Sequence, residues 1–99
     1  MLEDKVYETL LDFNIEPHLN GFRYIIDAVL NYEGNMKAME LYEIVAELYE
    51  TTPQRVERSI RHAFSVMDFK SESVQEFFGK KFTNIGYISI LKWKLTRGY

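Results

Sequence analysis

The chain has 99 residues, of which 46% are hydrophobic and 27% charged, and its formal net charge is −3. These values are typical of one globular domain, predicted to span residues 1–99. The absence of cysteine excludes disulfides, thiol catalysis and cysteine-ligated zinc, and because the sequence has neither a signal peptide nor an apolar run of about 20 residues, we expect a cytoplasmic protein that does not enter a membrane.

Apolar residues recur at helical spacing along the chain, and no segment alternates with the period of two that is typical of strands. The sequence therefore predicts an all-α fold, a six-helix bundle. The expected helices cover about residues 2–13, 20–30, 36–49, 53–67, 73–78 and 84–96. The third helix carries the core-facing pattern i, i+3, i+4, i+7 at Leu41, Ile44, Val45 and Leu48.

Capping residues mark several of these boundaries. Asn20 is the expected N-cap of the second helix. Pro53 suits the first position of the fourth helix, which makes Thr52 its N-cap, although a capping box of Thr51 with Gln54 is an alternative. For the last two helices two caps each are possible: Ser71 or Ser73, and Thr83 or Asn84.

The helix predicted over residues 53–67 has two opposed faces. Its apolar stripe, which suits docking on a core, consists of Val56, Ile60, Ala63, Phe64 and Met67. Its polar face consists of Gln54, Arg55, Arg58, Arg61, His62 and Ser65. Like charges at spacings of three and four repel each other, so stability does not explain three arginines here, whereas an anionic partner does.

Charge is divided unevenly between the two halves of the chain. Residues 1–50 hold three Lys/Arg and eleven Asp/Glu, a balance of −8, whereas residues 51–99 hold nine and four, a balance of +5. This asymmetry fits a polyanion bound by one side of the molecule. Attraction between the two halves explains it equally well.

The third and fourth helices, joined by a four-residue turn, have the organisation of a helix-turn-helix over about residues 37–67. In that motif the second helix enters the DNA major groove. Ala46 provides the small side chain that the first helix needs against the second, and Val56 provides an apolar contact after the turn. Glu50, in a turn where glycine is common, argues against the assignment.

The motif Thr51-Thr52-x-x-Arg55-Val56-Glu57-Arg58-x-Ile60-Arg61-His62-Ala63 resembles the recognition helix of the sporulation initiation response regulator, the stage-zero sporulation protein A family. Two further motifs resemble the starts of that family's second and last helices: His18-Leu19-x-Gly21-Phe22-x-Tyr24 and Lys81-x-Thr83-Asn84. The resemblance implies a helical effector domain of a bacterial transcription factor that binds double-stranded DNA, usually as a homodimer on repeated boxes.

The resemblance also implies roles for single residues. Arg55 and Arg58 match the family's base-contacting arginines and would each donate to guanine O6 and N7. Gln54 and His62 are further candidates for base contacts. Glu57 either accepts from cytosine N4 or pairs with Arg61 at i+4, and we favour the pairing. The expected phosphate contacts are Thr52, Arg61, Lys80, Lys81, Lys92 and Lys94, with Arg97 as a further candidate.

The chain departs from the family's pattern in three places. It contains no N-terminal phosphoacceptor domain, so if Met1 is the natural start, control through such a domain would be absent. The segment between the second and third helices is shorter than the family's, which leaves a dimer contact there open. Pro53 and Gln54 replace the small residues expected at those positions, which leaves the target sequence open.

A competing hypothesis is a stand-alone protein-interaction module that docks another regulator, with the acidic first half as its contact surface. Neither hypothesis includes an enzyme, because the sequence lacks a phosphate loop, a nucleophile elbow and metal-ligand spacing, and we expect no cofactor and no metal. His18 is expected to make a structural hydrogen bond. Most aromatic residues are expected in the core, with Trp93, flanked by Lys92 and Lys94, as the exception to watch.

Overall fold

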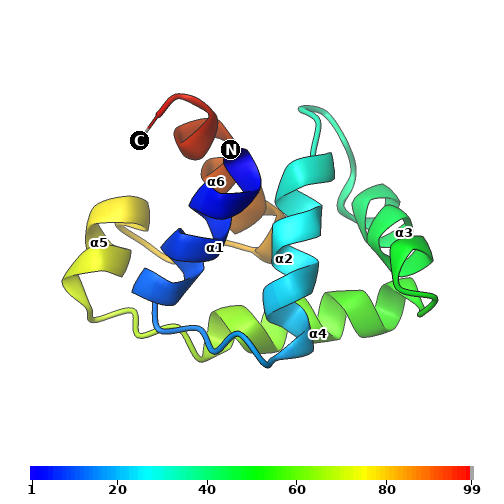
Figure 1. The fold of residues 1–99 in the computed structure, drawn as a ribbon, viewed down its shortest axis with the longest axis horizontal. Coiled ribbons are helices and arrows are strands. Elements are labelled where there is room, and N and C mark those ends of the chain that lie inside the picture. The colour runs from blue at the N-terminus through cyan, green and yellow to red at the C-terminus, as the bar shows by residue number, and fades with distance from the viewer. Residues whose placement is uncertain (99) are drawn as a thin grey trace.

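The computed structural model describes residues 1–98, and within them it contains six α-helices and no strand, which confirms the predicted all-α class. The helices are α1 (Leu2–Asp12), α2 (Asn20–Asn31), α3 (Ala38–Leu48), α4 (Pro53–Ser65), α5 (Glu72–Phe78) and α6 (Asn84–Thr96). In Figure 1, α4 runs along the lower edge, α1 and α2 stand above it, and α3 and α5 lie at opposite ends.

One hydrophobic core joins the six helices. Its fully buried side chains include Val6, Leu10, Phe22, Ile25, Val29, Leu41, Val45, Val56, Ile60, Val74, Ile88 and Leu91. The expectation for Leu48 was wrong, since its side chain is 59% exposed. Leu48 is the last residue of α3 and lies at the margin of the apolar stripe. Because the helix ends there, no following turn shields its side chain from solvent.

Side-chain caps fix the starts of three helices. The hydroxyl oxygen of Thr52 accepts a hydrogen bond from the Arg55 backbone N–H at 3.2 Å, which confirms Thr52 as the N-cap of α4. Of the paired alternatives, Ser71 caps α5 and Thr83 caps α6. Each hydroxyl satisfies one of the N–H groups that have no partner within the helix.

The prediction of Asn20 as an N-cap was wrong by one residue. Leu19 is the N-cap of α2, without a side-chain cap bond, and Asn20 is the first helical residue. Leu19 packs against the core while its backbone is extended, at φ −71° and ψ 136°. Packing of this apolar side chain therefore sets where the chain enters the helix.

Candidate nucleic-acid interface

The fourth helix presents two opposed faces, as predicted. Its buried residues are Val56, Ile60, Ala63 and Phe64. Its exposed residues are Gln54, Arg55, Arg58, Arg61, His62 and Ser65, which we call the basic ridge. Because the buried face packs on α2 and α3, the basic ridge is held on a rigid helix along one edge of the molecule (Figure 1).

The turn between α3 and α4 completes a helix-turn-helix. Glu50 takes a left-handed conformation with φ 50°, the position for which glycine is preferred. The Thr51 N–H then donates to the Ala46 carbonyl at 2.9 Å, closing the end of α3. The turn thus keeps the expected geometry although glycine is replaced by glutamate.

The first turn of α4 is fixed by Thr52 and Pro53. The Thr52 hydroxyl oxygen accepts a hydrogen bond from the backbone N–H of Arg55. Pro53 occupies the first helical position, where a missing N–H costs nothing. Gln54 and Arg55 follow immediately and are exposed. The two candidate base-contacting residues nearest the start of the helix therefore sit on a well-defined backbone.

Arg61 is paired with Glu57 one helical turn away. Its Nη1 lies 2.9 Å from Oε1 and 2.8 Å from Oε2 of the Glu57 carboxylate. The pairing that we favoured over a cytosine contact is therefore present in the protein without DNA. Such a pair on a helix surface contributes about 0.3–0.5 kcal/mol.

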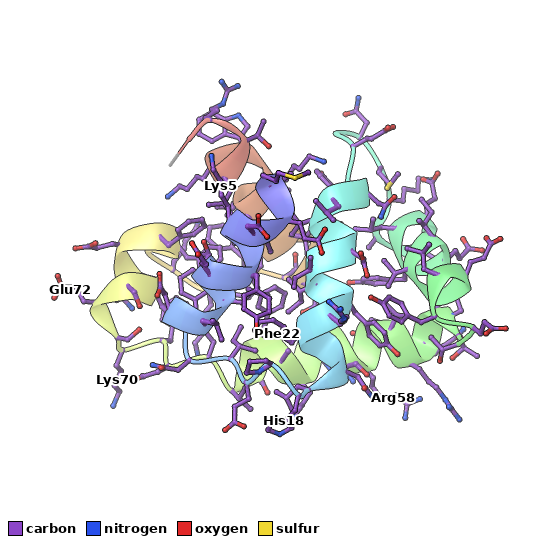
Figure 2. The ribbon with its side chains drawn as sticks, viewed as in Figure 1. Lys5, His18, Phe22, Arg58, Lys70 and Glu72 are labelled. Atoms are coloured by element: carbon purple, nitrogen blue, oxygen red, sulfur yellow. The ribbon has the colours of Figure 1, made fainter. Side chains whose placement is uncertain are left out.

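A hollow of about 660 Å³ lies between the start of α2 and the basic ridge. Its lining residues are Leu19, Asn20, Gly21, Arg58, Ser59, Arg61, His62 and Ser65. Figure 2 shows Arg58 and His18 on the same lower edge of the molecule, along which α4 runs. The position of Asn20 beside the ridge could not be predicted from the sequence, because no spacing along the chain connects it with residues 58–65.

His18 lies at this edge as an exposed residue. Its Nδ1 is 3.1 Å from Oε2 of Glu16, and both side chains are largely exposed. His18 therefore lies close to one carboxylate of the same loop, and the structural hydrogen bond expected for it stays a prediction. Among residues 1–98, no group of three His, Asp or Glu side chains lies close enough to hold a metal ion.

Lys80 and Lys81 lie in the segment that leads into α6. The Lys81 Nζ is 5.9 Å from the centre of the Phe69 ring and the Lys80 Nζ is 5.4 Å from that of Phe82. Lys81 and Arg61 line a common hollow of about 340 Å³. Lys81 therefore belongs to the same side of the molecule as the basic ridge.

Lys92 and Lys94 are engaged elsewhere. The Lys92 Nζ donates to the carbonyls of Val29, Leu30 and Tyr32 at 3.0–3.2 Å, at the C-terminal end of α2. The Lys94 Nζ donates to the Phe77 carbonyl. Their ammonium groups join helices to one another, so these two lysines are not part of the proposed interface.

Trp93, between them, does not belong to the core. Its side chain is 60% exposed, and the Arg97 guanidinium lies 4.3 Å from its ring centre. This cation–π contact explains how a large aromatic residue is accommodated at the surface. Trp93 lies on α6, outside the basic ridge.

The fold agrees with a comparison to known families. Residues 6–92 match the family model described as sporulation initiation factor Spo0A C terminal. The match includes α2 to α5, all of the basic ridge, and most of α1 and α6. No helix of the described residues is long and apolar enough to cross a membrane.

Proposed function

The chain belongs to the family of sporulation initiation factor Spo0A C-terminal domains, which are helical DNA-binding regulatory domains, and from this membership we propose that it recognises a specific double-stranded DNA sequence with α4 in the major groove. The basic ridge is the observation that carries the proposal. A helix of about 10–12 Å diameter fits the major groove, which is about 12 Å wide.

Within this proposal, Arg55 and Arg58 contact bases. Both side chains are exposed on the first two turns of α4, the part of a recognition helix that approaches base edges. A guanidinium that donates two hydrogen bonds to guanine discriminates by about 1–3 kcal/mol. Gln54 and His62, exposed on the same ridge, are the further candidates.

Phosphate contacts are proposed on the ridge and beside it. Thr52 lies just before α4, Arg61 lies past the middle of α4, and Lys80 and Lys81 lie in the segment before α6. Such contacts fix the register of a protein on the duplex without reading its sequence. They account for most of the salt dependence of binding.

Binding to a panel of duplexes at fixed salt tests the proposal. The preferred duplex is first selected from a random pool, which also shows whether bound sequences contain one box or the repeat that a homodimer requires. Arg58→Ala should lose about 1–3 kcal/mol of discrimination, and Arg58→Lys should retain affinity but not discrimination, because an ammonium cannot donate in the same two-pronged geometry.

Lys70→Ala is the matched control, because Lys70 is an exposed cation well away from Arg58 in Figure 2. It should leave discrimination unchanged. Absence of any duplex preference at about 100 mM salt would contradict the proposal. Tight binding to another protein that survives loss of Arg55 and Arg58 would favour the competing interaction module.

A further inference from the structure

The pair of Glu57 and Arg61 leaves one edge of the guanidinium available. Both carboxylate oxygens of Glu57 contact the same nitrogen, Nη1. Within residues 1–98, Nε and Nη2 of Arg61 make no hydrogen bond. The Arg61 side chain is 60% exposed and that of Glu57 31% exposed, so the guanidinium is held on one side and open to solvent on the other.

Glu57 lies where three helices meet. Its backbone carbonyl accepts a hydrogen bond from Asn84 Nδ2 of α6 at 3.5 Å, and Asn84 lines one hollow together with Tyr42 of α3. Glu57 and Arg61 line the same hollow, whose volume is about 420 Å³. The backbone that carries the carboxylate is thereby fixed, and with it the direction in which Arg61 is held.

The carboxylate has a second effect on a helix that faces DNA. It is the only acidic side chain on α4, and it neutralises one of three arginines. An acidic group near the phosphates lowers affinity for every duplex alike. The lost affinity is recovered only with a duplex that places a phosphate against Nε and Nη2 of Arg61.

We propose that Glu57 is a positioning residue that makes the phosphate contact of Arg61 selective. It holds the guanidinium by Nη1, directs Nε and Nη2 toward one phosphate position, and weakens binding to duplexes that lack this fit. The inference rests on the proposed function of α4 as the recognition helix. It assigns Glu57 a role through Arg61, not a contact with cytosine.

Glu57→Gln tests the charge effect, with Glu76→Gln on α5 as the control, since it removes the same charge from an exposed position outside the ridge. Affinity for arbitrary duplexes should rise by about twofold with Glu57→Gln, which corresponds to the strength of an exposed i,i+4 ion pair, and more than with the control. Thermal unfolding followed by circular dichroism should show that both variants are folded.

A double-mutant cycle with Arg61→Ala tests the positioning. In the native background, Arg61→Ala should weaken the preferred duplex about tenfold more than an arbitrary duplex, as expected for a charged hydrogen bond. In the Glu57→Gln background the two losses should become equal. The inference would be overturned if Arg61→Ala distinguished the two duplexes to the same extent in both backgrounds. It would also be overturned if the effect of Glu57→Gln were confined to one base pair of the target.

The proposed function can survive that result. If Arg58→Ala abolishes discrimination while the Glu57 and Arg61 cycle shows no coupling, the recognition helix stands and only the role of Glu57 is wrong. If the native chain shows no duplex preference, the proposed function fails first and this inference fails with it.

Discussion

Gly21 at the start of α2 lies directly against the Ser59 carbonyl in the middle of α4. A β-carbon at Gly21 would lie 2.1 Å from that oxygen and 2.8 Å from the β-carbon of Ala63. The two helix backbones are therefore in contact, and neither neighbour is the end of a flexible side chain that could move away. This crossing of α2 and α4 fixes the backbone of the helix that carries the basic ridge.

Gly21→Ala should destabilise the fold by about 3 kcal/mol, toward the upper end of overpacking in a dense core. The urea midpoint measures the loss. Gly34→Ala is the control, because a β-carbon there meets no atom within 4 Å, and it should change stability by less than about 0.5 kcal/mol. Equal stability of the two variants would show that α2 and α4 can separate without cost.

Lys92→Met should destabilise the fold by about 1–3 kcal/mol, because it keeps the apolar stem but removes the ammonium group that donates to three carbonyls at the end of α2. It should leave the salt dependence of DNA binding unchanged. Lys70→Met, at an exposed lysine outside any helix, provides the control in urea unfolding. A reduced salt slope in Lys92→Met would instead return Lys92 to the DNA interface.

Thr52→Ala should cost about 1 kcal/mol, the usual loss for a helix N-cap. Thr52→Ser keeps the hydroxyl that accepts from the Arg55 N–H and should remain within about 0.5 kcal/mol of the native chain. Urea unfolding of the two variants isolates the cap. A serine variant as unstable as the alanine variant would assign the effect to the lost methyl group.

Tyr49 should make stability fall at high pH. Its hydroxyl donates to the Asp27 carboxylate, and partial burial together with this hydrogen bond raises the pKa of Tyr49 from 10.0 to about 12. The protonated Tyr49 hydroxyl therefore stabilises the fold. This stabilisation is fully present below the pKa of tyrosine in the unfolded chain, and it is lost as pH rises through the pKa of Tyr49 in the folded chain.

Tyr49→Phe removes both the hydrogen bond and this dependence. The difference in urea midpoint between the native chain and Tyr49→Phe should therefore be constant near pH 8 and shrink between about pH 10 and about pH 12. The comparison cancels the titration of the other tyrosines and of lysines. A difference that stays constant across that interval would contradict the role of Asp27.

Local signals in the sequence predicted much of the fold. Helical spacing, capping residues and chain breaks located all six helices, and Pro53 indicated the start of α4, although Thr51 remained an alternative to Thr52 as its capping residue. Where two side chains could both serve as the N-cap, as Thr83 and Asn84 could for α6, the sequence did not decide between them. Packing between helices decides, because the Asn84 side chain donates to the Glu57 backbone carbonyl of α4.

Contacts between distant segments could not be predicted in the same way. The carbonyl acceptors of Lys92 lie 60–63 residues away, so its sequence context, beside Trp93 and Lys94, indicated only an exposed cation. Gly21 formed part of a recognised motif, but its contact with Ser59 depends on how α2 crosses α4. The Glu57–Arg61 pair was predictable because both partners lie on one helix.

The separation of charge between the two halves of the chain has a consequence for the kinetics of association. Exposed carboxylates lie on α1 and α3, among them Glu3, Asp4, Glu8, Glu40, Glu43 and Glu47, whereas α4 exposes its arginines. The protein therefore has an electric dipole moment, and in the proposed mode of binding the field of a duplex would turn α4 toward it before contact. Encounters through α1 or α3 would be repelled, so salt should slow the association rate more than it changes the dissociation rate.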